Sequence, residues 1–313
     1  MASQAGFGEY FVPFSFKDYT NPTSAPTLYR EVAYALCAYV ERDALDFDPP
    51  FVDDLNEPLG VIELGSGTGV VAASIASTTR HAARPGGFVI ATDLPDVCPL
   101  LQHNLGINGR HRANSDAVFA RPLAWGNLGH VTSISREFDF DHCRLTHIVC
   151  SDLASTLVRS GSLRRSSLTM TLHAQVYFPE LFGPLLRTLI HLTSPSCVSS
   201  SWLPAKIVVS YMIRSLPKET PFWTAFGLWF SFQSVLARRD ASEPWRQFGA
   251  DEDTDRTFVF VAHRRPESIA WHVPETDKEL MEGVGARDTT TKKGDDTFET
   301  ILFMAMGIDN TSE

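Results

Sequence analysis

The sequence predicts a doubly wound α/β domain, in which helices cover both faces of a mainly parallel sheet. Apolar stretches of strand length, at 61–64, 88–93 and 145–152, alternate with segments whose apolar residues have helical spacing. The first strand runs directly into a glycine-rich turn and a helix, and the other two end in Asp93 and Asp152. Strands that are apolar on both faces belong to covered parallel sheets. We therefore expect a ligand site at the edge where these strands end.

Residues 1–59 are expected to form an N-terminal lead-in and helix. Prolines among polar residues favour irregular structure over 1–27. Over 28–40 the apolar residues have helical spacing, which predicts a short amphipathic helix.

The turn Gly65-Ser66-Gly67-Thr68-Gly69 marks the expected ligand site. Glycine adopts positive φ without strain and has no Cβ, so the backbone can approach a ligand closely while the next helix, predicted over 70–79, points its N-terminus inward. A dinucleotide site requires the spacing G-x-G-x-x-G, whereas the spacing here is G-x-G-x-G and Glu63 precedes it. A carboxylate there would repel a pyrophosphate but suits a ligand with an ammonium group, such as S-adenosylmethionine. A phosphate ligand and a tight connection without a ligand are the alternatives.

The segment Glu63-Leu64-Gly65-Ser66-Gly67-Thr68-Gly69 resembles the first motif of the class I, or seven-strand, methyltransferases. Most members of that class share this motif. The resemblance therefore implies S-adenosylmethionine as the cofactor and leaves the substrate open.

Asp93 ends the second predicted strand, 88–93, at the same edge as the glycine turn. Its carboxylate can accept hydrogen bonds from both hydroxyls of a ribose bound across that turn. We place the neighbouring Leu94 in the cofactor site as well. The alternative is that Asp93 caps the next helix, predicted over 96–108.

A third strand, predicted over 117–123, ends at Trp125. Leu123-Ala124-Trp125-Gly126 resembles the leucine-x-tryptophan-glycine of protein-lysine methyltransferases, where the resemblance implies that the tryptophan borders the adenine. An indole at a strand end offers a flat apolar face to a purine, although a tryptophan of the core is the alternative. A polar loop is expected over 129–144, before the fourth strand, and we assign His147 inside that strand no role.

The fourth strand delivers Ser151 and Asp152 to the same edge and is followed by a serine- and arginine-rich stretch, 154–175, which we interpret as an insertion. Without that stretch the chain reads Asp152-Leu153-Val176-Tyr177, the Asp-x-x-Tyr pattern of the same family. The resemblance implies that Asp152 and Tyr177 lie beside the transferred methyl group. Two hypotheses explain the stretch, an intron translated in frame or a disordered lid.

The remaining elements complete one methyltransferase domain over 60–264. The segment 176–182 is predicted to open a helix, followed by a strand over 205–213 and a helix over 218–229. Apolar stretches at 232–236 and 257–262 can pair as terminal antiparallel strands. We expect 265–313 to be a tail, partly ordered over 275–296, with a docking helix that contains Phe298.

Composition limits the partners. The chain has 313 residues, of which 43% are hydrophobic and 20% charged, as in soluble globular proteins. Its formal net charge of −10 argues against nucleic acid and is compatible with a basic protein substrate, or serves solubility alone. Five cysteines without a C-x-x-C pair suggest neither a disulfide framework nor a metal site. No stretch approaches the roughly 20 apolar residues of a membrane span, so we expect a cytoplasmic or nuclear protein. We also expect the protein to be a monomer.

Taken together, these motifs over 60–262 resemble the fungal protein-lysine methyltransferases of the family that modifies elongation factors and chaperones. The resemblance implies a seven-stranded Rossmann-like sheet with a terminal antiparallel hairpin. It also implies methyl transfer to a lysine of a basic or translation-related protein, without a metal. The expected catalytic residues are Asp152 and Tyr177, and the expected cofactor-binding residues are Glu63, Gly65, Ser66, Gly67, Gly69, Asp93, Leu94, Trp125 and Ser151. A small-molecule N-methyltransferase and a catalytically silent binding protein are the alternatives.

Overall fold

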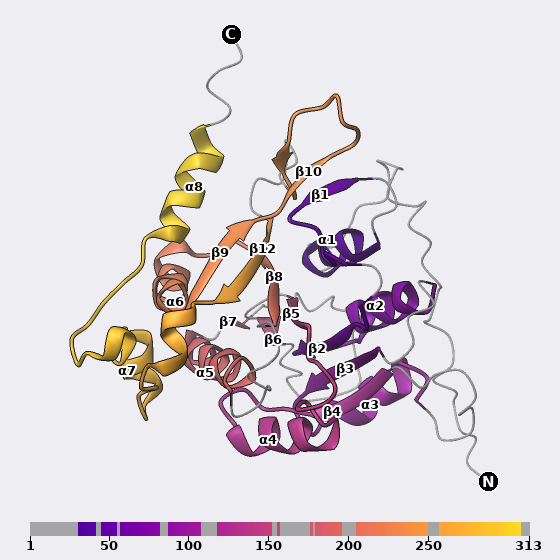
Figure 1. Cartoon of the computed structure of the whole chain (residues 1–313), viewed down its shortest axis with the longest axis horizontal. Helices are drawn as coiled ribbons and strands as arrows, with labels where there is room; N and C mark the ends of the chain where they lie inside the picture. The colour runs from indigo at the N-terminus through magenta and orange to yellow at the C-terminus, as the bar shows by residue number, and fades with distance from the viewer. Residues whose placement is uncertain are drawn as a thin grey trace, which may run out of the picture.

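A computed structural model describes residues 31–41, 45–54, 57–81, 87–107, 118–151, 155–156, 176–177, 179–195, 205–249 and 257–307. Within these ranges a seven-stranded sheet forms the middle of three layers (Figure 1). Its strand order is β4-β3-β2-β5-β8-β12-β9. The strands are β2 (Gly60–Leu64), β3 (Phe88–Asp93), β4 (Val118–Pro122), β5 (His147–Ser151), β8 (Lys206–Met212), β9 (Phe230–Ser234) and β12 (Thr257–Arg264).

The first five strands of this order are parallel, and β12 runs antiparallel between β8 and β9. In the register, Leu64 of β2 lies opposite both Thr92 of β3 and Cys150 of β5. The carboxyl ends of these strands therefore meet at one edge, as the sequence predicted. The fold class is confirmed, including the antiparallel pairing of the two last strands, in which Ala262 lies opposite Phe232.

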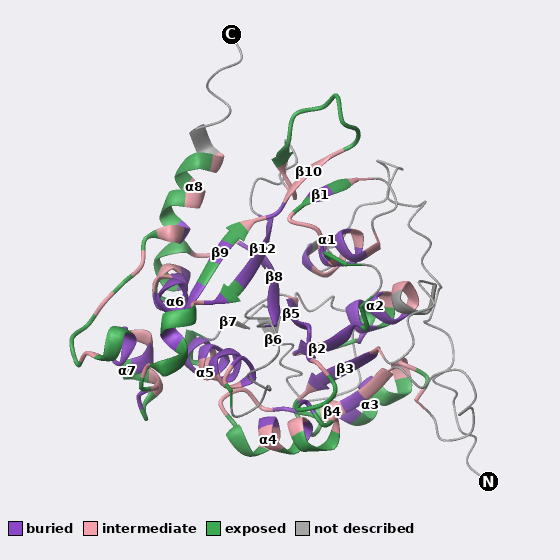
Figure 2. Ribbon diagram, viewed as in Figure 1, coloured by how far each residue is buried: buried purple, intermediate pink, exposed green. Residues whose placement is uncertain are grey.

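Helices cover both faces of the sheet because its strands alternate apolar residues between the two sides (Figure 2). One face carries α1 (Glu31–Glu41), α2 (Val70–His81) and α3 (Cys98–Asn104), and the other carries α4 (Leu128–Glu137), α5 (Phe182–Leu192), α6 (Leu216–Trp229) and α8 (Thr297–Gly307). Along β2, Val61 belongs to the core of the first face, whereas Ile62 and Leu64 belong to the core of the second. A period of two is what a strand buried on both sides requires.

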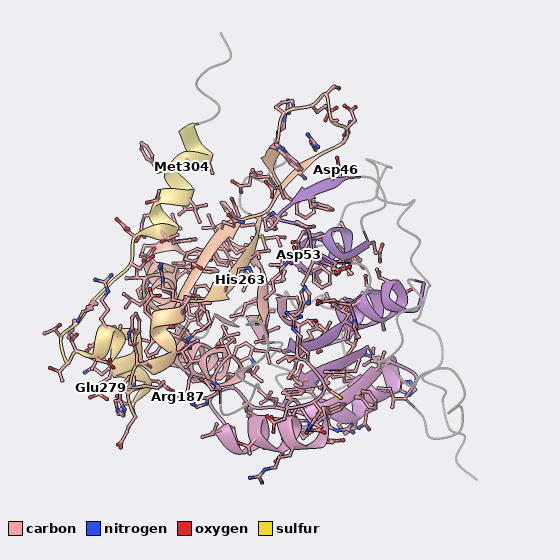
Figure 3. The ribbon with its side chains drawn as sticks, viewed as in Figure 1. Asp46, Asp53, Arg187, His263, Glu279 and Met304 are labelled. Carbon is pink, nitrogen blue, oxygen red and sulfur yellow. The ribbon has the colours of Figure 1, made fainter. Side chains whose placement is uncertain are left out.

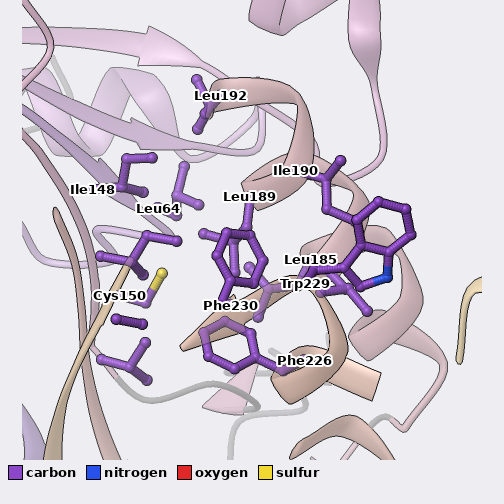
Figure 4. Close-up of a cluster of buried hydrophobic side chains, with 14 of the residues drawn as sticks. Leu64, Ile148, Cys150, Leu185, Leu189, Ile190, Leu192, Phe226, Trp229 and Phe230 are labelled. Atoms are coloured by element: carbon purple, nitrogen blue, oxygen red, sulfur yellow. The ribbon is translucent and has the colours of Figure 1, made fainter. Parts of the chain in front are cut away.

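The second face holds the larger core. Figure 4 shows Leu189 of α5 facing Leu64 and Ile148 of the sheet, and all three are buried. Farther along this face, Trp223 of α6 stacks on Phe298 of α8 with ring centroids 5.2 Å apart. Helix α5 is thus fixed by burial of its apolar face, independently of any ligand.

A small second sheet joins segments far apart in the chain. It consists of β1 (Asp46–Asp48), β10 (Leu236–Arg238) and β11 (Arg246–Gln247), all antiparallel. Phe47 packs edge-on against Phe248 at 4.9 Å between ring centroids. This sheet attaches the segment after α1 to the C-terminal half of the domain.

The prediction of a loop over 129–144 is wrong, because most of that stretch forms α4. Asn127 caps this helix by accepting a hydrogen bond from the His130 N–H at 3.1 Å, and Val131 and Ile134 are buried one turn apart. The segment resembled a loop because its remaining positions are mostly polar and include Thr132 and Ser133. Their hydroxyls donate to carbonyls one turn back, as from Ser133 to Gly129.

Helix α3 is shorter than the predicted 96–108. Pro99 lies in its first turn, where a missing N–H is tolerated, and the helix ends at Asn104. Gly106, with φ of 68°, turns the chain away from the helix axis.

The C-terminal segment is folded against the domain, and the prediction of a partly ordered stretch over 275–296 is wrong. It contains η3 (Pro266–Ala270), α7 (Asp277–Met281), η4 (Ala286–Asp288) and α8. Arg187 of α5, which Figure 3 labels, binds Asp277 at 2.7 Å and the Pro274 carbonyl at 2.8 Å. Phe298, in the helix that was predicted to dock, is buried. On its outer side α8 exposes Phe303 and Met304.

At the edge of the sheet opposite the glycine turn, two buried polar side chains, His147 and Lys206, bind the segment after β1. Nε2 of His147 lies 2.7 Å from the Phe51 carbonyl oxygen, and Lys206 Nζ lies 2.8 Å from Asp53 Oδ2. Burial lowers the pKa of His147 from 6.5 to about 3. His147 therefore connects the segment after β1 to the start of β5. This is a structural role, and the sequence had predicted no functional role for it.

The first prediction concerns this histidine. Between pH 6.5 and about 3 the unfolded chain binds the imidazole proton while the folded chain does not. The contribution of His147 to stability is thus present above pH 6.5 and is lost as the pH falls toward 3. We expect His147→Gln, which cannot titrate, to be closer to the wild type in free energy of unfolding at pH 5 than at pH 7. Urea unfolding at both pH values measures this difference, and an equal difference at both would contradict the assignment.

Candidate functional site

The glycine turn after β2 has the conformation that its residues predicted. Gly65, Gly67 and Gly69 have φ values of 70°, 53° and 82°, in the left-handed region that favours glycine. A Cβ on Gly65 would lie 3.1 Å from Trp125 Cζ2, and one on Gly69 would lie 2.8 Å from Leu101 Cδ1. A Cβ on Gly67 would meet no described atom within 4 Å. The outer two glycines are therefore needed for packing, and Gly67 leaves open space above an exposed turn.

Asp93 holds this turn from the end of β3. Its Oδ2 accepts a hydrogen bond from the Gly67 N–H at 2.8 Å, and its Oδ1 accepts one from the Leu94 N–H at 2.7 Å. The N-cap of α3 is Val97, which has no side-chain cap, so Asp93 does not cap that helix. Each carboxylate oxygen retains a lone pair for a further donor. The Asp93 carboxylate therefore lies at the glycine turn, and its contact with a ribose stays a prediction.

A second pair of hydrogen bonds joins the same two strands. The Thr92 N–H donates to Ser66 Oγ at 3.0 Å, and the Ser66 N–H donates to the Thr92 carbonyl at 2.8 Å. Ser66 is buried. Its side chain therefore holds the turn against β3. If Ser66 binds the cofactor, as predicted, it would do so through its backbone.

Glu63 lies beneath the turn rather than at its surface. The side chain is fully buried, its Oε2 accepts the Ala72 N–H at 3.1 Å, and the Ser151 hydroxyl donates to Oε1 at 3.4 Å. Burial raises the pKa of Glu63 from 4.5 to about 7. The carboxylate thus joins β2 to the first turn of α2 and to the end of β5. Direct contact with a ligand ammonium group stays a prediction.

Trp125 reaches the glycine turn from the loop after β4. The Leu123 N–H donates to the Asp93 carbonyl at 2.8 Å, which fixes the start of this loop against β3. The indole is half-buried and packs against both Gly65 and the larger core. The structure therefore brings Trp125, Asp93 and the glycines together, and the contact with adenine stays a prediction.

For the two predicted catalytic residues, Asp152 and Tyr177, the structure describes only the backbone of Tyr177 and of neighbouring residues. Asp152 lies outside the described residues, as does most of the predicted insertion. The strand β6 (Ser155–Thr156) pairs antiparallel with β7 (Val176–Tyr177), so that Ser155 lies opposite Tyr177. The chain leaving β5 and the chain entering α5 through η2 (Pro179–Leu181) are therefore neighbours. The roles of Asp152 and Tyr177 stay predictions.

Two residues that were not among the predicted site residues also support the turn. The Thr92 hydroxyl donates to the Glu63 carbonyl at 2.6 Å, and Asn104 Nδ2 donates to the Thr68 carbonyl at 3.1 Å. Asn104 lies in the helix that was predicted over 96–108. Its polar side chain between apolar positions of the helix was the available signal.

Two further properties concern the described part of the chain alone. Within it, no three histidine, cysteine, aspartate or glutamate side chains gather where they could hold a metal ion. The helices described there are all too short or too polar to cross a membrane.

The strand order, with its antiparallel strand β12 between β8 and β9, together with the glycine turn and Asp93, defines the class I methyltransferase architecture. Residues 15–153 match the model of a family described as lysine methyltransferase. The chain is also 26% identical over 181 residues to the protein-lysine N-methyltransferase EFM6 of Saccharomyces cerevisiae. This match covers 57% of the chain and 60% of that relative's length. The resemblance to the lysine methyltransferases is confirmed.

Solved structures of methyltransferases resemble the chain as well. A predicted O-methyltransferase of Agrobacterium tumefaciens, protein Atu636, is 12% identical with a TM-score of 0.39, and the match covers 74% of this chain and 80% of that one. The mitomycin 7-O-methyltransferase MmcR is 12% identical with a TM-score of 0.36, covering 75% of this chain and 54% of that one. The fold assignment above depends on the strand order and register alone.

The second prediction uses the raised pKa of Glu63. Between pH 4.5 and about 7 the folded chain keeps the carboxyl proton that the unfolded chain loses, so the side chain contributes less to stability as the pH rises. Glu63→Gln has no charge to bury. We expect the variant to gain stability relative to the wild type between pH 5 and pH 8. Chemical unfolding at the two pH values tests this, and a gap that does not change with pH would refute the assignment.

Proposed function

We propose that this chain is an S-adenosylmethionine-dependent protein-lysine N-methyltransferase. The observation that carries the proposal is the bond from the Gly67 N–H to Asp93, which holds an exposed glycine turn and a carboxylate together at the edge of the sheet. The family match over 15–153 and the yeast relative support lysine as the accepting side chain. We also propose that the enzyme is a monomer, that it uses no metal, and that it acts in the cytoplasm or nucleus.

The residues at this edge fit the parts of the cofactor. The open space above Gly67 admits the ligand close to the backbone, Asp93 would hold the ribose hydroxyls, and Trp125 would border the adenine. When bound, S-adenosylmethionine supplies an electrophilic methyl group. Glu63 would act through the helix and strand that it joins.

Methylation of a lysine needs a neutral amine that is aligned with the methyl group. An apolar channel lowers the lysine pKa by desolvation, and Asp152 would orient the amine. With the cofactor held by Asp93 and Trp125, the lysine nitrogen would bond to the methyl carbon as the carbon–sulfur bond breaks, and the ammonium product would release a proton to water. Positioning supplies most of the effect, so no strong general base is required. The net charge of −10 favours a basic protein as the substrate.

The third prediction tests the ribose contact. Asp93→Ala should weaken binding of S-adenosylhomocysteine by about 1.5–3 kcal/mol, because it removes hydrogen bonds to a charged acceptor. Isothermal titration calorimetry measures the change. Asp96→Ala, an exposed carboxylate near the same turn, is the matched control and should bind as the wild type does. Equal affinities of Asp93→Ala and the wild type would show that the ribose lies elsewhere.

The fourth prediction tests the reaction. Incubation of the purified chain with methyl-labelled cofactor and a lysate should place label in a protein, with methyl-lysine recovered after hydrolysis. Gly67→Val should abolish labelling, because a β-branched side chain is strained at φ of 53° and would fill the open space. Label only in small molecules would instead indicate a small-molecule N-methyltransferase. Cofactor binding without label in any fraction would indicate a silent fold.

A further inference from the structure

A buried hydroxyl of helix α5 is hydrogen-bonded to the tryptophan loop. Thr188 lies in the middle of this helix and is 0% exposed. Its Oγ1 accepts a hydrogen bond from the Gly126 N–H at 2.7 Å. Gly126 directly follows Trp125, so this bond fixes the backbone beside the indole.

The direction of this bond is set by a second one. The Thr188 hydroxyl donates its proton to the Pro184 carbonyl at 2.9 Å, one turn back in the helix. A hydroxyl has one proton, so its lone pairs are left to accept the Gly126 N–H. Because the Pro184 carbonyl belongs to the regular backbone of α5, the acceptor is held in a fixed orientation.

Shape reinforces the hydrogen bond. Gly126 has φ of 81°, and a Cβ there would lie 3.2 Å from Pro184 Cβ, so the loop approaches α5 more closely than a larger residue allows. On the other side of the loop, the indole of Trp125 lies against Gly65. The loop is thus held between the glycine turn and α5, and a change at either side would move the indole.

Helix α5 is itself a rigid support for this contact. Its apolar face is buried against the sheet through Leu185 and Leu189. On its outer side, Gly183 admits the side chain of Asp277, which is paired with Arg187. A hydroxyl on a helix packed in this way has a fixed position relative to the sheet and can therefore fix the position of a neighbouring loop.

We propose that Thr188 is a positioning residue for the adenine of the cofactor, acting through Gly126 and Trp125. The inference rests on the proposed function, because it gives Trp125 a purine to contact. It extends that function because it names the residue that would fix the position of the indole against the purine. This residue lies 62 positions after Gly126, on helix α5. Thr188 touches no ligand itself.

The test is the affinity for S-adenosylhomocysteine, measured by calorimetry on the full chain. Thr188→Val keeps the shape and removes the hydroxyl, so Gly126 loses its acceptor. We expect the affinity to fall roughly 3- to 10-fold, the effect of one neutral hydrogen bond. Thr188→Ser retains the hydroxyl and should bind nearly as the wild type does.

A matched control, Thr193, lies at the C-terminal end of the same helix. The hydroxyl of Thr193 is also buried, but it donates to the Leu189 carbonyl at 2.7 Å and has no described contact with the loop. Thr193→Val removes a buried hydroxyl of α5 at comparable cost to stability. It should leave the affinity unchanged, which separates positioning of the loop from loss of helix stability.

A double-mutant cycle shows whether Thr188 acts through the indole. If it does, Thr188→Val should weaken binding in the wild type and have no further effect in Trp125→Ala. Should Thr188→Val fail to fold, Gly126→Ala perturbs the same contact from the loop side and enters the same cycle.

The outcomes separate the inference about Thr188 from the proposed function. Unchanged affinity in Thr188→Val, an equal loss in Thr193→Val, or an additive effect with Trp125→Ala would overturn the inference and leave the proposed function standing. If the wild-type chain fails to bind S-adenosylhomocysteine, the proposed function is overturned and the inference with it.

Discussion

The structure of the site depends on the attachment of one exposed turn to the strand beside it. The N–H of Gly67 bonds to the carboxylate of Asp93, and the backbones and side chains of Ser66 and Thr92 exchange two further bonds. A glycine turn has little side-chain packing to hold it and gains conformational entropy when released. These bonds offset that entropy, so that the turn keeps one conformation at the edge where α2, β3 and the tryptophan loop converge.

The sheet and the position of its ligand edge could be predicted from the sequence because both depend on local patterns. Fully apolar strands, a glycine turn and an aspartate at a strand end are contiguous, and parallel pairing places them at one edge. Helix α4 could not be predicted in the same way. Its stability derives from burial of Val131 and Ile134 and from the Asn127 cap, and these outweigh the weak helix propensity of its serines and threonines.

The supporting contacts of the site were also beyond the sequence, because they join residues far apart in the chain. Thr188 and Gly126 are separated by 62 positions, and Ser151 and Glu63 by 88. Nothing in the local pattern around a threonine in an apolar helix distinguishes it from a helix residue that bonds only to its own turn, as Thr193 does. The pairing appears only when the helices are placed on the sheet.

The place of β12 between β8 and β9 has a consequence for synthesis of the chain. Since β9 pairs with β12 in this sheet, it has no partner there until the later strand has left the ribosome. The parallel strands with the ligand edge are complete well before that point. The aromatic core around Trp223 closes later still, when Phe298 emerges. The nascent chain therefore carries a nearly complete cofactor edge while its other end lacks a partner, an interval in which an unpaired strand is open to non-native pairing.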